Sequence, residues 1–390
     1  MNHFDFDEII ERRHTNSLKY DFAVERGYPA DVTPFWVADM DFRAPQAVRD
    51  TIRQRAEHGI FGYSQPKEEY YAALEEWFGS HHGWWPGKDA VVITPGVVFA
   101  LSMAVRAFTA PGDAVLVTEP VYYPFFSTIE GNGRTLVKST LRFEDGAYRL
   151  DFANIEAKIA AHKVKLLLLC SPHNPVGRVW RREELARLAA ICLAHDVLVV
   201  ADEIHADFVR PGHKHTVFAS LSPEIAARTV TCTAPSKTFN LAGLQLSNIF
   251  IAEKSLRRAF QKEVYSTGYA EPNIFGLLAA QAAYSEGGDW LAALLSYLEE
   301  NTERTRRFLA ERLPKVQLIE PEGTYLLWLD FRAYGLDAKA LDKKIIEEAR
   351  LWLDDGAIFG ASGAGFQRLN IACPWKTLEK GLEALARAFG

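Results

Sequence analysis

Several features are scarce in this sequence, and each scarcity argues against a class of protein. The four cysteines, Cys170, Cys192, Cys232 and Cys373, lie far apart without a CxxC pair, which argues against a disulfide framework or a cysteine-ligated zinc site and predicts buried thiols. No window approaches about 18 uninterrupted apolar residues, so no membrane-spanning helix is expected. The formal charge of -6 and the lack of a dense Lys/Arg run make a nucleic-acid or membrane surface unexpected.

The beginning of the chain also lacks a secretory signal. Residues 1–10 are acidic and have neither a basic head nor an apolar run, so we expect a cytoplasmic protein. The 390 residues, 48% of them hydrophobic, are enough for more than one domain. We expect an N-terminal arm with part of the small domain at 1–45, a large domain at 46–285 and a small C-terminal domain at 286–390. Small-molecule chemistry is the function class that this composition favours.

From about residue 90, short apolar runs alternate with helical patterns. The runs typical of strands buried on both faces are at 91–93, 114–117, 165–169, 197–200, 230–232 and 248–251. Segments with helical spacing are at 45–58, 66–79, 96–108, 124–131, 152–162, 182–195 and 254–266. This alternation predicts an α/β domain with a largely parallel sheet, in which ligands bind beyond the carboxyl ends of the strands.

The residues after the first two runs have features of a cofactor site. A glycine turn at 94–100 opens a helix whose free amides can bind a phosphate, although a glycine needed only for packing is the alternative. Tyr122 and Tyr123 follow the second run and offer flat faces for a ring to stack on. Aromatic core residues are the alternative there.

The next three strand ends carry an amide, a carboxylate and a lysine. Asn174 lies in a rigid segment rich in proline, and Asp202 follows its strand directly, where an unpaired carboxylate is costly. Lys237 is the only charge in the segment 234–244. A desolvated lysine amine is a nucleophile toward carbonyls, whereas a lone lysine is usually a surface residue. Together these five strand ends predict a site for a flat, phosphorylated, nitrogen-containing aldehyde.

Three further segments supply candidate residues. Two aspartates stand among aromatic residues at 34–42, where an edge strand and turn is the alternative, and Tyr63 lies at the tip of a turn-rich loop. A long helical pattern at 286–313 leads to a smaller α+β region, in which Arg368 presents a guanidinium that matches a carboxylate. A surface salt bridge is the alternative for Arg368. In this region we expect strands at 316–319, 324–330 and 366–372 and helices near 337–350 and 376–389.

Nearly end to end, the chain resembles the fold-type I pyridoxal-phosphate enzymes, and within them the aminotransferase-like carbon-sulfur lyases that include cystathionine β-lyases. The motifs that carry the resemblance are WVADMDF at 36–42, ADEIH at 201–205, SKTFNLAG at 236–243, PEGTY at 321–325 and GFQRLNIACP at 365–374. The resemblance implies a mainly parallel seven-stranded sheet in the large domain and a smaller α+β domain.

The resemblance also implies a role for individual residues. Lys237 would bind pyridoxal 5'-phosphate covalently, with Asp202 on the pyridine nitrogen. Tyr122 would stack on the ring and take part in catalysis, Asn174 would hydrogen-bond the ring hydroxyl, and His205 would be a further cofactor-binding residue. The phosphate would be bound by the amides of Val97 and Val98, by Ser236, and by Tyr63 of the other subunit of a homodimer with shared active sites. The substrate would contact Arg368 through its α-carboxylate, as well as Trp36 and Asn174.

The sequence departs from the wider aminotransferase pattern at two positions and from the pattern of the lyase branch at one. His205 stands where many relatives have a tyrosine, and Gln245 where many have a phosphate-binding arginine. The lyase branch tolerates both differences, and they suggest that the phosphate relies on amides and hydroxyls. Trp375 follows Pro374, where this branch often has an arginine.

The resemblance predicts a β-lyase that cleaves cystathionine or related S-substituted cysteines to a thiol, pyruvate and ammonia. No second arginine stands in a matching motif to bind a distal carboxylate, and an apolar wall for a thioether is available from Phe35, Trp36, Tyr122 and Tyr123. An aminotransferase is the alternative, because it would use the same residues. A regulator that acts by binding another protein is a second alternative.

Overall fold

A computed structural model describes residues 4–390; the first three residues of the predicted N-terminal arm lie outside the described residues. Its largest sheet has seven strands, as the resemblance implied. In order across the sheet they are β2 (Val91–Thr94), β10 (Ser247–Phe250), β9 (Thr229–Thr233), β8 (Leu198–Asp202), β7 (Leu166–Cys170), β3 (Ala114–Glu119) and β4 (Thr135–Thr140). Only β10 runs antiparallel to its neighbours within this sheet, so the sheet is mainly parallel, as predicted.

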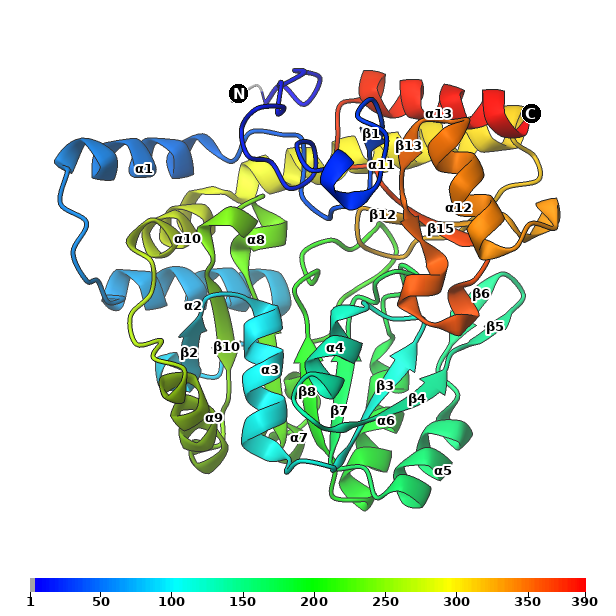
Figure 1. Ribbon diagram of the computed structural model, residues 1–390. Helices are drawn as coiled ribbons and strands as arrows, with labels where there is room; N and C mark the ends of the chain where they lie inside the picture. Colours follow the sequence, from blue (N-terminus) through cyan, green and yellow to red (C-terminus); the bar gives the residue numbers. More distant parts are fainter. Residues whose placement is uncertain (1–3) are drawn as a thin grey trace.

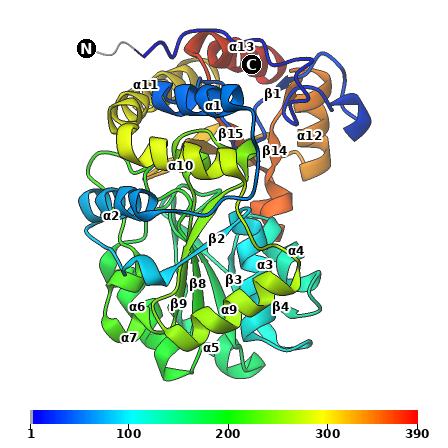
Figure 2. The same cartoon turned by 90° about the vertical axis from the view of Figure 1, so that its left-hand side faces the viewer.

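Helices cover both faces of this sheet, which explains its continuous apolar strands. One face packs against α3 (Val97–Phe108), α4 (Pro124–Glu130) and α9 (Lys254–Ser266), and the other against α5 (Phe152–His162) and α6 (Arg182–Ala194). Figure 2 shows α3 and α9 on one side of the strands and α6 and the short α7 (Pro223–Ala226) on the other. Every residue of β3 and β7 is buried, because both faces of these strands are covered.

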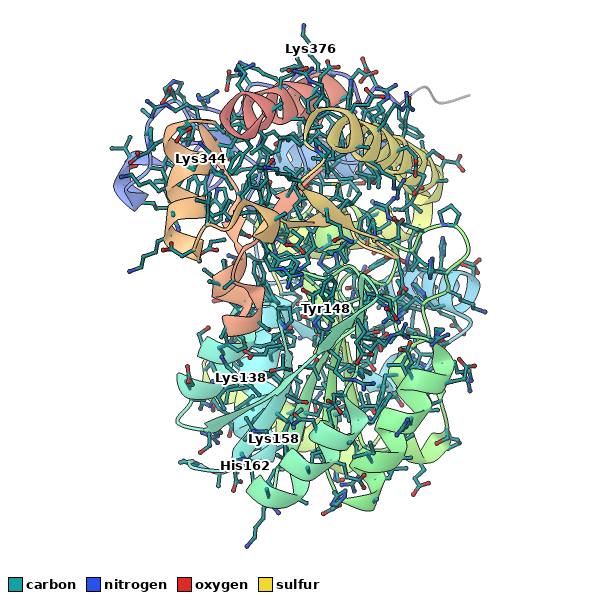
Figure 3. All side chains as sticks on the ribbon, turned by 90° about the vertical axis from the view of Figure 1, so that its right-hand side faces the viewer. Lys138, Tyr148, Lys158, His162, Lys344 and Lys376 are labelled. Carbon is teal, nitrogen blue, oxygen red and sulfur yellow. The ribbon has the colours of Figure 1, made fainter. Side chains whose placement is uncertain are left out.

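A second, antiparallel sheet lies above the first in Figure 1. Its strands are, in order, β11 (Gln317–Ile319), β12 (Leu326–Asp330), β15 (Phe366–Asn370) and β14 (Asp354–Asp355). The helices of this region are α11 (Gly288–Arg312), α12 (Ala338–Glu347) and α13 (Trp375–Phe389). Tyr148, labelled in Figure 3, comes from the hairpin of β5 (Arg142–Glu144) and β6 (Ala147–Arg149) and accepts a hydrogen bond of 3.1 Å from Trp328 Nε1 of the upper sheet.

The N-terminal arm packs on this upper region. Its strand β1 (Thr33–Pro34) pairs in parallel with β13 (Leu351–Trp352), and Figure 1 shows the arm beside α13 and β13. After the arm come α1 (Gln46–His58) and α2 (Glu68–His82), and α10 (Ile274–Glu286) lies beside α1 in both ribbon views. No helix among the described residues is long and apolar enough to cross a membrane.

Most elements lie where the sequence predicted them, and the differences have local causes. β4 escaped prediction because it is an edge strand whose exposed and buried residues are mixed. The helix predicted at 337–350 ends at Glu347, shortly before Arg350, whose φ of 55° is incompatible with a continuing helix. The domain boundaries at 45/46 and 285/286 stay a prediction.

Candidate active site

The parallel strands bring the predicted residues to one edge of the sheet. Cys170 at the end of β7 lies opposite Asp202 at the end of β8, and Asp202 lies opposite Cys232 of β9. Asn174 follows β7, and Lys237 follows β9 on the four-residue helix α8 (Pro235–Thr238). The alternation of strands and helices therefore places an amide, a carboxylate and an amine side by side.

Lys237 points toward the segment 36–42, which we call the arm segment. Its Nζ donates a hydrogen bond of 2.7 Å to the carbonyl oxygen of Ala38, which also accepts one of 2.9 Å from the Tyr325 hydroxyl. Burial lowers the pKa of Lys237 to about 8; Asp39 opposes this shift, and the charge of Arg368 adds to it. A substantial fraction of the amine is therefore neutral near physiological pH and available as a nucleophile or base.

Asp202 is a buried carboxylate without a protein cation. One oxygen, Oδ1, accepts a hydrogen bond of 3.2 Å from the amide of Ile204. Between residues 4 and 390, no Lys, Arg or His nitrogen lies within 4.0 Å of it. Burial raises the pKa of Asp202 to about 7, although the Ile204 amide and Lys237 oppose the shift. An unpaired carboxylate in such a place suits a ligand that brings an N–H cation.

Arg368 is buried, so its interpretation as a surface salt bridge is wrong. Its Nη1 donates to Asn174 Oδ1 at 3.0 Å, and its Nη2 donates to the Trp36 carbonyl oxygen at 2.7 Å and to Asp354. Trp36 thus contacts Arg368 through its backbone, while its indole stacks on Trp352 at a centroid distance of 4.3 Å. The contacts link the candidate substrate-binding residues of the two sheets.

His205 and Tyr122 lie close to these groups. Burial, with a smaller contribution from the charges of Lys237 and Arg368, lowers the pKa of His205 to about 3, so the imidazole is neutral at physiological pH. Its Nδ1 is buried and has no hydrogen-bond partner in the part of the chain that the structure describes. Tyr122 is partly buried, its amide donates to the Asn174 carbonyl at 3.0 Å, and burial raises the pKa of its phenol above the ordinary value.

The candidate phosphate site lies at the beginning of α3. The first amides of a helix have no partner within the helix, and here they belong to Val97, Val98 and Phe99. Among residues 4–390, no atom outside the neighbouring residues lies within 4 Å of a Cβ added at Gly96, so the described part of the chain leaves the space before the helix open. Ser236 is partly buried, whereas Gln245 is exposed.

These residues fit pyridoxal phosphate. The lysine matches its aldehyde, the unpaired buried carboxylate of Asp202 matches its pyridinium, and the open α3 terminus matches its phosphate. Val98 is 42% exposed and Tyr63 is 96% exposed. Tyr63 lies in the loop between α1 and α2, which forms one edge of the molecule in Figure 1.

A cavity of about 630 Å³ opens beside Lys237. Its lining includes Val37, Met40, Asp39, Arg12 and Asn240. Phe35 was expected to contribute to an apolar wall around the substrate, but it is fully buried and its ring faces Gly381 of α13. The expectation was wrong because alternate residues of an extended segment point to opposite sides.

The sequence did not reveal what holds the arm segment in place. Arg12 donates to Asp39 and Asp41 at 2.6 Å each, and the buried Lys19 donates to Asp41 at 2.9 Å. On the other side of the segment, Asn370 Nδ2 donates to the carbonyl oxygens of Val37 and Asp39 at 2.6 and 2.7 Å. The two aspartates among aromatic residues are therefore ion-pair partners of the N-terminal arm, and only a charge pattern spread over residues 12–41 hinted at this.

We expect Lys19→Met to reduce the free energy of unfolding by about 3 kcal/mol or more, because Asp41 would keep a buried charge with one partner fewer. Urea denaturation followed by circular dichroism measures this. Lys88→Met is the matched control, since Lys88 pairs with Glu68 on the surface and its loss should change little. If both substitutions changed the free energy of unfolding equally, the buried ion pair of Lys19 and Asp41 would not stabilise the fold as we expect.

The chain is similar to known proteins over most of its length. The family model described as aminotransferase class I and II matches residues 30–385. Cystathionine beta-lyase PatB of Bacillus subtilis (strain 168) is 46% identical over 383 residues, which cover 98% of this chain and 99% of the relative.

Two solved structures are similar over almost the whole chain. Cystalysin from Treponema denticola, which contains a pyridoxal 5'-phosphate cofactor, matches with a TM-score of 0.96 and 38% identity and covers 99% of this chain and 98% of its own. The pyridoxal-phosphate-bound C-S lyase from Staphylococcus hominis matches with a TM-score of 0.93 and 34% identity, again covering 99% and 98%.

Proposed function

Since the chain belongs to the class I and II aminotransferase family, in its group of pyridoxal-phosphate-dependent carbon-sulfur lyases, we propose that it cleaves cystathionine or a related S-substituted cysteine. The products are a thiol, pyruvate and ammonia. The observation that supports this most directly is the grouping of Lys237, Asp202 and Arg368 around one site in a chain that resembles such lyases from end to end.

Each residue of the site has a part in holding the cofactor and the substrate. Lys237 would bind the aldehyde and Asp202 the pyridinium, and Asn174, His205 and Tyr122 would surround the ring. The amides of Val97 and Val98 and the hydroxyl of Ser236 would hold the phosphate. Arg368 binds the substrate α-carboxylate, with Trp36 and Asn174 beside it. These assignments are supported by the hydrogen bonds of Arg368 to Asn174 and Trp36, by the free amides at the beginning of α3 and by the resemblance to the family.

The reaction begins with the removal of a proton from the substrate α-carbon. Pyridoxal phosphate, when bound, supplies an electron sink for the negative charge that develops there. Lys237, whose pKa is lowered by burial, takes this proton. Asp202 keeps the proton on the pyridine nitrogen, and Arg368 fixes the α-carboxylate. A thiolate on the β-carbon then leaves, and water completes the conversion to pyruvate and ammonia.

The experiment that tests this function is a substrate panel. Purified protein loaded with pyridoxal phosphate is given cystathionine and several S-substituted cysteines, and free thiol and pyruvate are measured together. We expect both products in equal, turnover amounts. Absence of thiol from every member of the panel would contradict the proposal.

We also propose a homodimer in which Tyr63 of one subunit reaches the phosphate of the other. Support comes from exposed apolar side chains in both segments: Ile60 and Phe61, in the same loop as Tyr63, are 65% and 57% exposed, and Val98, at the beginning of α3, is 42% exposed. Surfaces of this kind commonly mark protein interfaces. We further propose that the protein is cytoplasmic, because its four cysteines are free and buried.

We expect Tyr63→Phe to weaken pyridoxal-phosphate binding about tenfold or more, since a hydrogen bond to a charged group contributes roughly 1.5–3 kcal/mol. The dissociation constant is measured by titrating the apoprotein with cofactor, and light scattering gives the mass of the particle. Tyr334→Phe, in the 3-10 helix after β12, is the control and should bind the cofactor normally. A monomeric particle, or normal binding by Tyr63→Phe, would contradict the shared site.

A further inference from the structure

The guanidinium of Arg368, proposed to bind the substrate carboxylate, already donates a hydrogen bond to a carboxylate of the protein, that of Asp354. Asp354 lies on β14 directly opposite Arg368 on β15, and its Oδ2 accepts a hydrogen bond from Arg368 Nη2. The two side chains are only 5% and 3% exposed, so solvent screens their interaction little. The register of the two strands therefore builds a counter-charge into the carboxylate-binding site.

The position of Arg368 does not depend on that charge alone. Asn174 Oδ1 and the Trp36 carbonyl oxygen each accept a hydrogen bond from the guanidinium, at 3.0 and 2.7 Å, and the Phe359 ring centroid lies 5.0 Å from its central carbon. These two bonds and the bond to Asp354 use three of the five N–H groups of the guanidinium. The buried Nε of Arg368 has no hydrogen-bond partner among residues 4–390, so donors remain for an incoming carboxylate.

The neighbourhood of Asp354 leaves its carboxylate ionised at neutral pH. Burial raises its pKa to about 6, while Arg368 lowers it and the nearby Asp355 raises it. Asp355 itself points elsewhere, since its Oδ1 accepts a hydrogen bond of 3.2 Å from the amide of Ala357. Above about pH 6 the pair of Arg368 and Asp354 is therefore close to neutral overall.

We propose that Asp354 is a specificity-determining residue that weakens the binding of free carboxylates at Arg368, so that ligands with only a carboxylate are held poorly. The inference rests on the proposed function, in which Arg368 binds the substrate α-carboxylate. An incoming carboxylate meets a nearly neutral pair instead of a full positive charge and is repelled by a fixed like charge. While the cofactor is in its aldehyde form, an amino acid has a second attachment, because its amine exchanges with Lys237, whereas a 2-oxo acid binds there through its carboxylate alone.

The consequence concerns the choice between elimination and amino transfer. Amino transfer needs a 2-oxo acid to bind as acceptor, and elimination needs its own 2-oxo acid product to leave. The negative charge of Asp354 beside Arg368 weakens the binding of the acceptor's carboxylate and favours the release of the product. Asp354 thus selects for amino acids over 2-oxo acids without contacting the part of the ligand by which they differ.

The test uses cofactor-loaded protein and acetate as the simplest carboxylate, with binding measured by isothermal titration calorimetry at pH 7.5. Asp354→Asn keeps the size and a hydrogen-bonding oxygen but removes the charge, and we expect it to bind acetate at least about tenfold more tightly, as a coupling of one pKa unit implies. Inhibition of thiol release by pyruvate should strengthen by a similar factor. Asp355→Asn is the matched control and should behave like the unchanged protein.

Unchanged or weaker acetate binding by Asp354→Asn, with cofactor absorbance and circular dichroism preserved, would overturn the inference. Arg368→Gln separates this failure from that of the proposed function. If Arg368→Gln loses acetate binding while Asp354→Asn gains nothing, Arg368 is the carboxylate site and only the role of Asp354 is wrong. If Arg368→Gln binds acetate normally, the assignment of Arg368 itself fails, and the inference with it.

Discussion

Replacement of Lys237 by alanine is expected to lower the rate of thiol release by at least about a thousandfold, while the fold is preserved. One side chain both attaches the cofactor and moves the α proton, and removal of a group with two such roles costs more than removal of a proton-transfer group alone. The short helix α8 that carries it begins at Pro235 and does not need the lysine side chain for its hydrogen bonds. Steady-state kinetics with saturating cofactor measures the loss.

Two comparisons make this result specific. Lys254→Ala changes an exposed lysine at the beginning of α9 and should leave the rate unchanged. Treatment of the unchanged protein with borohydride should fix the cofactor to Lys237, which peptide mapping identifies. Recovery of the reduced adduct on any other lysine, or substantial thiol release by Lys237→Ala, would contradict the central assignment.

Replacement of Asp202 by alanine is expected to lower activity by at least about a hundredfold while cofactor is still bound, because the carboxylate maintains the proton on the pyridine nitrogen. Asp202→Asn keeps the size of the side chain and should show a similar loss. Absorbance titration measures cofactor binding separately from turnover. Near-normal turnover in a variant whose circular dichroism is unchanged would show that Asp202 does not have this role.

Asp202→Asn is also expected to stabilise the apoprotein at alkaline pH. The folded-state pKa of Asp202, about 7, lies above its ordinary value of 3.8, so the folded state binds more protons between these values. Stability therefore falls as the pH rises from about 4 to 7, by at most about 4 kcal/mol, and stays low above pH 7. Asp202→Asn lacks this loss, so its advantage in thermal melting should be large at pH 8 and nearly absent at pH 4. A constant difference at both pH values would contradict the raised pKa.

The strand ends were predictable from the sequence because they follow local rules. Asp202 stands at the end of one apolar run and Lys237 follows another within a few residues; the runs are long enough only for strands, and parallel strands must bring their carboxyl ends together. The family motifs supplied what these rules leave open, such as the participation of Arg368 from a different sheet. The roles of these residues stay a prediction until the variants are measured.

Contacts between distant segments were beyond sequence reasoning. The carbonyl oxygen of Ala38 has no signature in the sequence, yet it accepts hydrogen bonds from both Lys237 and Tyr325, which lie 199 and 287 positions away along the chain. Asp354 escaped notice because its importance comes from its strand register opposite Arg368, and β14 is only two residues long. Backbone groups and short edge strands are defined by tertiary structure rather than by local patterns.

The partition of products from cystathionine tests the proposed lyase function most directly. Pyruvate, homocysteine and the amine form of the cofactor are measured in the same reaction, with and without a common 2-oxo acid. A lyase should accumulate pyruvate and homocysteine in equal amounts over many turnovers, and it should transfer the amino group to the 2-oxo acid slowly. Rapid cycling between the aldehyde and amine forms of the cofactor, without release of thiol from any cysteine conjugate, would contradict the lyase function and identify an aminotransferase.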